Sequence, residues 1–273
     1  MTQPRILMCP PDHFEVGYAI NPWMRGNVDQ LDADLAARQW KDLVSGISEV
    51  ADVVTLQPQP GLPDMVFTAN AGIVYRNRAM GAHFMPEERR GEEPYYKEWF
   101  SQDGFEHYDL PEDIAFEGAG DCLLDRGEAW VWTGYGIRSE ITAREHLKRF
   151  YDDREVISMR LVDERFYHID TCLCPLTRGY LLYYPEAFDE PSRREIDSRV
   201  PEEKRIIASD EDAEHFACNA VNVGDTLFLS GCTDALNTRL RDAGFKVREM
   251  KLGEFLKSGG SAKCLTLRLD EPA

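Results

Sequence analysis

The sequence predicts an α/β fold made of five copies of one unit, each a strand, a second strand, a helix and a third strand. One observation behind this prediction is a short polar or glycine-rich segment that recurs before five apolar segments. A second observation is that the same order of elements follows each recurrence. The segments are marked by Gly72, Asp121, Thr171, Asn219 and Lys263, at intervals of 49, 50, 48 and 44 residues. A nearly constant period of this size is typical of radial or stacked repetition of one supersecondary unit.

Each unit begins with a predicted pair of strands. Apolar segments broken by a short turn follow the first four markers, over residues 72–84, 122–134, 172–184 and 221–231. After the fifth marker, residues 264–269 form the last predicted strand, and residues 5–10 can supply its partner. The two ends of the chain would then belong to one unit.

Helices and third strands complete the units. Helical periodicity is present over residues 31–47, 87–100, 139–151 and 233–244, the last with a glycine stop signal. Segments rich in β-branched residues follow over 51–57, 154–162 and 245–252. No linker-like or low-complexity tract interrupts the pattern, so we expect one domain.

Composition limits the classes of partner and the compartment. The chain has 31 basic against 49 acidic residues, a formal net charge of −18, whereas nucleic-acid binding relies on Lys and Arg. An acidic field would attract a cationic substrate, although keeping the protein soluble is the simpler explanation. No apolar run is long enough to cross a bilayer, and no secretory signal is visible at the start. Seven cysteines without a repeating spacing favour reduced thiols. We therefore expect a cytoplasmic protein that binds neither nucleic acid nor membrane.

Chemically reactive side chains gather at equivalent places, the starts of the repeated strand pairs. A radial arrangement brings equivalent strand ends together around an axis, so we expect these side chains to converge. Singly, each has a structural explanation, since a cysteine among apolar residues is usually a small core residue and polar residues often hold turns. Together they supply a nucleophile, a proton shuttle and carboxylates, the groups that covalent hydrolysis requires. The set is Asn70, Glu117, Asp121, His168, Asp170 and Cys264.

Four motifs, in order along the chain, give this pattern a specific resemblance. They are PDMVFTANAG (63–72), FEGAGD (116–121), YHIDTCLCP (167–175) and GGSAKC (259–264). Over nearly its whole length the chain resembles the guanidine-modifying enzymes, which include arginine deiminases, dimethylarginine hydrolases and amidinotransferases. The resemblance implies a five-bladed, pseudo-symmetric α/β propeller, the pentein fold, as a single catalytic domain over residues 1–273. It implies neither a cofactor nor a metal, and it leaves a homo-oligomer possible.

The first motif is most similar to that of the arginine dihydrolases, which convert arginine to ornithine, carbon dioxide and ammonia. The expected substrate is therefore a small guanidino compound, arginine. Cys264 would attack the guanidinium carbon and expel ammonia, leaving a thiouronium-like intermediate. His168 would protonate the departing amine and then activate water, and Glu117 would orient and stabilise that histidine. Asp170, expected on the same strand face as His168, would pair with the guanidinium nitrogens. Asp121 is either a second guanidinium partner or a structural turn residue.

Further candidates concern the amino-acid end of the substrate. Arg138, in GYGIRS, and Arg90 are expected to clamp the α-carboxylate, although the neighbouring Arg89 could equally be the second clamp. The loop 13–24 is rich in glycine and aromatic residues and is a candidate lid. Two more candidate substrate contacts are Asn21 in that loop and Phe67 in the first motif.

The residue type at position 70 is expected to distinguish between the reactions of this superfamily. Deiminases have an aspartate at the matching position, and a carboxylate there repels the carbonyl oxygen of citrulline. An asparagine amide carries both a donor and an acceptor, so it can hold the guanidinium first and the ureido oxygen afterwards. We therefore expect Cys264 to attack a second time and carry the reaction to ornithine. The alternative that Asn70 only caps the turn into Gly72 stays open.

Other reactions stay open as well. Dimethylarginine hydrolases usually have two acidic residues where this chain has Ala69 and Asn70. An arginine deiminase would stop at citrulline, an amidinotransferase would pass the amidino group to an amine, and a binding propeller would have no activity. A zinc site at His168, Cys172 and Cys174 lacks a second ligand pair with suitable spacing.

Overall fold

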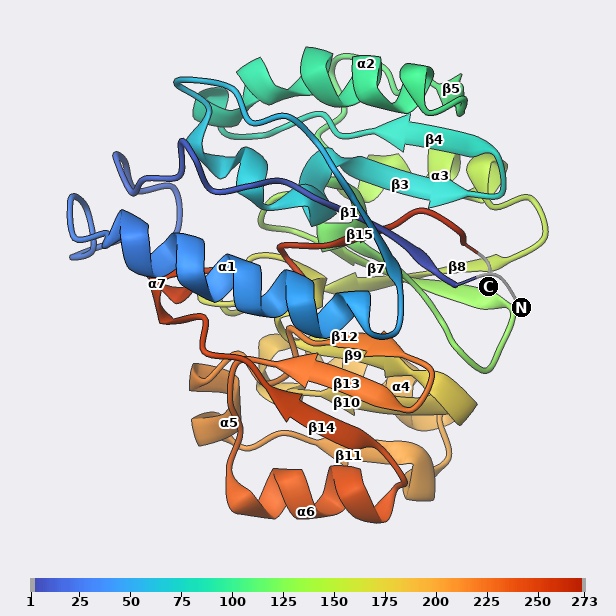
Figure 1. The fold of residues 1–273 in the computed structure, drawn as a ribbon. Helices are drawn as coiled ribbons and strands as arrows, with labels where there is room; N and C mark the ends of the chain where they lie inside the picture. Colours follow the sequence, from blue (N-terminus) through green and yellow to red (C-terminus); the bar gives the residue numbers. More distant parts are fainter. Residues whose placement is uncertain (1–2, 272–273) are drawn as a thin grey trace.

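The computed structural model describes residues 3–271, which contain five three-stranded sheets (Figure 1). The strands are β1 (Arg5–Met8), β2 (Asp52–Thr55), β3 (Gly72–Tyr75), β4 (Arg78–Gly81), β5 (Glu106–Tyr108), β6 (Cys122–Leu124), β7 (Trp130–Tyr135), β8 (Glu155–Arg160), β9 (Leu173–Leu176), β10 (Tyr180–Tyr183), β11 (Arg205–Ile207), β12 (Val221–Val223), β13 (Thr226–Leu229), β14 (Lys246–Glu249) and β15 (Leu267–Arg268).

All five sheets share one topology, which confirms the predicted repeat. Their strand orders are β3-β4-β5, β6-β7-β8, β9-β10-β11, β12-β13-β14 and β15-β1-β2. In each sheet the middle strand is antiparallel to the first strand and parallel to the third. The last sheet joins the two ends of the chain as predicted, because Ile6 pairs with Arg268. The fold is the expected five-bladed α/β propeller.

A helix connects the second and third strand of every blade, and two short helices lie between blades. The helices are α1 (Ala33–Ser48), α2 (Glu93–Gln102), α3 (Arg144–Phe150), α4 (Glu190–Arg199), α5 (Asp210–Glu214), α6 (Asp234–Asp242) and α7 (Gly253–Leu256). In Figure 1, α2 and α6 lie at opposite outer edges of the molecule, with sheets between them. Among the described residues, no helix has the length and apolar character needed to span a membrane.

The longest of these helices illustrates how local sequence sets an element. Asp32 caps α1 by accepting a hydrogen bond from the Leu35 amide, which satisfies a backbone donor at the helix start. Ala36, Trp40 and Leu43 recur at helical spacing and are buried against the sheets.

The sequence pattern did not identify helix α4 and strand β11 of the sheet β9-β10-β11, or strand β5 of the sheet β3-β4-β5. Helix α4 buries only Ser192 and Ile196 and so has no apolar stripe to recognise. Strands β5 and β11 have three residues each and are partly exposed. Elements this short and polar are defined by their neighbours and not by their own pattern.

Short 3₁₀ turns precede the first strands of three blades and pack against one another where the blades meet. They are η2 (Thr68–Ala71), η4 (Gly118–Gly120) and η6 (Ile169–Thr171). The approach is close, since a Cβ added at Gly118, which has a φ of +62°, would lie 2.8 Å from the backbone N and O of Gly72. The prediction that His168 and Asp170 share one face of a strand is wrong: His168 precedes η6 and Asp170 lies within it. Because polar residues such as Asp170 lie in these short turns, the strands begin only after them.

Candidate active site

Cys264 and Asp170 form the centre of the site. The Cys264 side chain is buried, and its Sγ lies 3.7 and 3.8 Å from the two carboxylate oxygens of Asp170. Burial raises the pKa of the Cys264 thiol above its usual range, and the charge of Asp170 raises it further. Burial also raises the pKa of Asp170 to about 7, against the opposing charge of Lys263. Within residues 3–271, no Lys or Arg side chain forms an ion pair with Asp170. The pair is therefore a buried thiol beside a buried carboxylate that has no ion-pair partner among the described residues.

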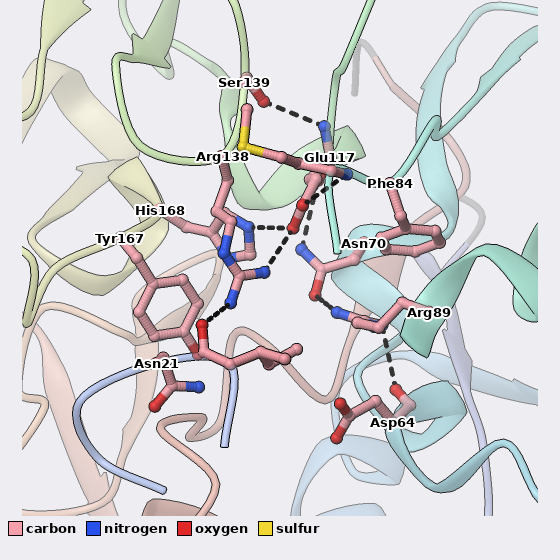
Figure 2. A network of polar contacts seen from close by, with 12 residues as sticks. Asn21, Asp64, Asn70, Phe84, Arg89, Glu117, Arg138, Ser139, Tyr167 and His168 are labelled. Carbon is pink, nitrogen blue, oxygen red and sulfur yellow. Dashed lines mark hydrogen bonds and ion pairs between the residues drawn. The ribbon is translucent and has the colours of Figure 1, made fainter. Parts of the chain in front are cut away.

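His168 and Glu117 form a second buried pair, which Arg138 joins (Figure 2). Nε2 of His168 lies 2.6 Å from Oε2 of Glu117, and Arg138 donates to the same oxygen at 3.1 Å. Burial opposes ionisation of Glu117, but the Arg138 charge and the His168 hydrogen bond outweigh it and lower its pKa to about 2. Burial lowers the pKa of His168 to about 4 even though Glu117 favours its charged form. A neutral His168 donates its Nε2 proton to Glu117, which leaves Nδ1 as the basic nitrogen.

Asn70 lies beside this pair with its amide orientation fixed. Its Oδ1 accepts a hydrogen bond from Nη1 of Arg89 at 2.8 Å, and its Nδ2 donates to the backbone oxygen of Glu117 at 3.2 Å. A Cβ added at Gly120 would lie 2.3 Å from Asn70 Nδ2 and 3.2 Å from His168 Nδ1, so that glycine makes room for both groups. One N–H of the Asn70 amide remains for another acceptor.

Arg89, and not Arg90, is the arginine at the site, which corrects the assignment from sequence. Arg89 is buried: besides Asn70, it donates to the backbone oxygen of Asp64 and to both carboxylate oxygens of Glu92. Arg90 is exposed and donates to the backbone oxygens of Phe84 and Met85. In a 3₁₀ turn, consecutive residues point in different directions, so only one of two adjacent arginines can face inward.

Asp121 has its carboxylate oxygens already engaged in structural hydrogen bonds. Ser139 donates its hydroxyl to one oxygen at 2.6 Å, and the Ile169 amide donates to the other at 3.0 Å. Burial raises the pKa of Asp121 well above its usual range. Of the two roles left open by the sequence, these contacts favour the structural turn residue.

The loop containing Asn21 covers the site. The Asn21 side chain accepts from the amides of Trp23 and Met24 and donates to the backbone oxygen of Ser258, so it holds the loop's own shape. Arg138 anchors the loop through a 2.8 Å hydrogen bond to the backbone oxygen of Ile20. Beneath the loop is a cavity with room for about one water molecule. Its lining includes Asn21, Phe67, Asn70, Arg89, Arg138 and Cys264.

Comparison with known proteins agrees with this geometry. The family model of eukaryotic N,N-dimethylarginine dimethylhydrolases matches residues 19–270. The chain belongs to this family of guanidine-modifying enzymes. A dimethylarginine dimethylaminohydrolase of Mycobacterium tuberculosis is 37% identical over 97% of this chain and 85% of its own length. The bifunctional arginine dihydrolase/ornithine cyclodeaminase ArgZ of Synechocystis is 55% identical over 98% of this chain, which spans only 38% of that relative.

A solved structure of the N-terminal domain of ArgZ, a C264S mutant bound to substrate, superposes with a TM-score of 0.97. Its sequence is 54% identical, and 98% of each chain is covered. The dimethylarginine dimethylhydrolase family assignment and this superposition together establish the pentein fold.

One residue of the candidate active site was not identified as a candidate from sequence. Asn219 served only as a marker of the repeat, yet it is fully buried and donates a hydrogen bond to Cys264 Sγ at 3.1 Å. The available signal was the dipeptide Asn219-Ala220, which repeats Asn70-Ala71 at the equivalent place of another unit.

Proposed function

We propose that this chain is the catalytic unit of an arginine dihydrolase, carried by residues 1–273. One arginine and two water molecules would yield ornithine, carbon dioxide and two ammonia molecules. The observation that carries the proposal is the buried Cys264–Asp170 pair, a nucleophile beside a carboxylate with which no cationic side chain of residues 3–271 forms an ion pair. A guanidinium group is a planar cation that pairs well with a carboxylate, and it would supply the missing charge.

The first half-reaction uses the thiol proton. A cationic substrate beside Cys264 favours the thiolate, which attacks the guanidinium carbon and forms a C–S bond. The thiol proton passes through Nδ1 of His168 to the departing nitrogen, and ammonia leaves as the C–N bond breaks. His168 then takes a proton from water, the resulting hydroxide attacks the thiouronium carbon, and the C–S bond breaks to give citrulline. Glu117 keeps the histidine in the tautomer that leaves Nδ1 basic.

The second half-reaction repeats this sequence on the ureido group. Cys264 attacks the ureido carbon, a second ammonia leaves, and water cleaves the thiocarbamate to a carbamate that loses carbon dioxide. Asn70 supports this step because Arg89 occupies its oxygen and leaves an amide N–H as the group to offer. That N–H can donate to the ureido oxygen, which a carboxylate at this position would repel.

Substrate access requires motion of the covering loop. Arginine is far larger than the cavity beneath the loop, so residues 13–24 must move away from Arg138 and Ser258 to admit it. Arg138 is the proposed partner of the α-carboxylate, and binding would exchange its contact with the Ile20 carbonyl for a charged one. Arg89 is the proposed second cation at that end, while Phe67 and Asn21 line the same cavity.

The relatives support the same reaction. ArgZ is named a bifunctional arginine dihydrolase/ornithine cyclodeaminase, and its N-terminal domain, which matches 98% of this chain, is described as an arginine dihydrolase with substrate bound. The family name and the Mycobacterium tuberculosis relative support dimethylarginine hydrolysis as the second candidate.

Product analysis distinguishes these reactions. Purified protein is incubated separately with arginine, agmatine and dimethylarginine, and amino acids, ammonia and methylamines are quantified, with Cys264→Ser as the control. We expect ornithine and two ammonia per arginine consumed, and no product from the control. Citrulline as the end product would identify a deiminase, and dimethylamine release from dimethylarginine in preference to arginine turnover would identify the family's named activity.

A further inference from the structure

Asn219 joins the nucleophile to the carboxylate that faces it. Its Oδ1 accepts hydrogen bonds from the amides of Cys264 at 3.1 Å and Ser261 at 3.2 Å. Its Nδ2 donates to the backbone oxygen of Asp170 at 2.9 Å and to Cys264 Sγ at 3.1 Å. All four hydrogen-bonding positions of the side chain are therefore filled, and two of them hold Cys264.

The orientation of this amide follows from its partners. Two backbone N–H groups lie on one side and require an acceptor, while a carbonyl oxygen lies on the other side and requires a donor. The group that faces the sulfur must therefore be the NH₂. A donor directed at a sulfur atom stabilises a thiolate more than a thiol, because hydrogen bonds to charged groups are stronger.

Asn219 is the side chain that donates a hydrogen bond to this sulfur among the described residues, since His168 is hydrogen-bonded to Glu117. The Ser261 backbone N–H and the charge of Lys263 also lower the pKa of Cys264, whereas the Asp170 carboxylate disfavours a negative sulfur. We infer that Asn219 is a positioning residue of the reaction: it fixes the Cys264 sulfur beside Asp170 and donates an N–H that stabilises the thiolate each time it forms. This role builds on the proposed covalent chemistry, and it applies to both half-reactions.

The test measures the acidity of Cys264 and not turnover, so its outcome does not depend on arginine being the substrate. Iodoacetamide alkylates thiolates, and peptide-resolved mass spectrometry follows the Cys264 peptide separately from the other six cysteines. The rate of alkylation is measured against pH for the wild type and for Asn219→Asp, which keeps the acceptor oxygen and replaces the donor with a second oxygen. The matched control is Asn222→Asp, because Asn222 is on β12, the strand that follows Asn219. Among the described residues its side chain forms hydrogen bonds with Thr177, Gly224 and Thr226 and none with Cys264.

We expect the pH midpoint of Cys264 alkylation to rise by about one to two units in Asn219→Asp and to stay at the wild-type value in Asn222→Asp. Asn219→Ser replaces the amide with a shorter hydroxyl side chain and so removes the N–H that reaches the sulfur without adding a charge. We expect this variant to shift the midpoint in the same direction, and it replaces Asn219→Asp in the test if the aspartate variant does not fold. A wild-type midpoint in a folded Asn219 variant would overturn the inference and leave Asn219 as a structural tie. If the midpoint shifts but arginine gives no product in the wild type, the inference holds and the proposed substrate is wrong.

Discussion

Replacing Asp170 with asparagine should make the protein more stable at high pH and almost inactive. Burial raises the pKa of this carboxyl from 3.8 to about 7 in the folded protein. Between these values the folded state retains a proton that the unfolded chain has released, so stability falls as pH rises through this window. An asparagine, which has no charge to bury, removes that penalty.

The size of the effect follows from the two pKa values. With 1.36 kcal/mol per unit, the penalty is about 2 kcal/mol at pH 5 and reaches about 4 kcal/mol at pH 8, where it stops growing. The stability that Asp170→Asn gains over the wild type is therefore expected to be about 3 kcal/mol larger at pH 8 than at pH 5. Its activity should fall by orders of magnitude, since a neutral amide forms weaker hydrogen bonds to a guanidinium cation than a carboxylate does and supplies no opposite charge.

The assay is urea unfolding of the wild type and Asp170→Asn at several pH values, combined with ammonia release from arginine. Asp42→Asn is the control, because Asp42 is exposed on α1 and is not among the residues that line the cavity of the site. A variant that is less stable than the wild type, or that gains equally at pH 5 and pH 8, would refute the reasoning that Asp170 is an unpaired buried carboxylate.

Three further substitutions test the substrate contacts. Asn70→Asp replaces an amide donor with an acceptor, so the second half-reaction should slow by about 10²–10³-fold and citrulline should accumulate; an unchanged ratio of citrulline to ornithine by chromatography would contradict this role. Arg138→Ala should reduce kcat/KM for arginine more than for agmatine, which has no carboxylate, whereas equal losses would mean that Arg138 acts only through Glu117. Arg89→Ala should abolish ammonia release while Arg90→Ala leaves it within about twofold of the wild type, as expected for a surface substitution; similar effects of both would contradict the corrected assignment.

The fold could be predicted largely because its evidence is spread along the whole chain. Each strand pair has its own apolar pattern, and the regular spacing of markers such as Gly72 and Asp121 indicates that the units are equivalent. Pairing of residues 5–10 with residues 264–269 followed from counting, since four units had two initial strands and the fifth had one. What the pattern could not give was the 3₁₀ turns before the strands, because a three-residue turn has no periodicity.

The candidate site was predicted less completely, because the sequence does not determine the direction in which a side chain points or its tertiary contacts. Sequence spacing cannot tell which of Arg89 and Arg90 faces inward, because the turn that carries them fixes their directions only after folding. Asn219 was missed because its role depends on partners 42 to 49 positions away, Ser261, Cys264 and Asp170. Tertiary contacts of this kind have no local signature.

The central claim is that Cys264 forms a covalent bond to the guanidinium carbon of arginine. The most direct test uses arginine labelled at that carbon, with rapid acid quenching during turnover, digestion and mass spectrometry of the peptides. We predict that the label appears transiently on the peptide containing Cys264, is absent from Cys264→Ser, and leaves as carbon dioxide while unlabelled ornithine accumulates. Ornithine formation without any labelled peptide, or label carried by a different cysteine, would contradict the claim.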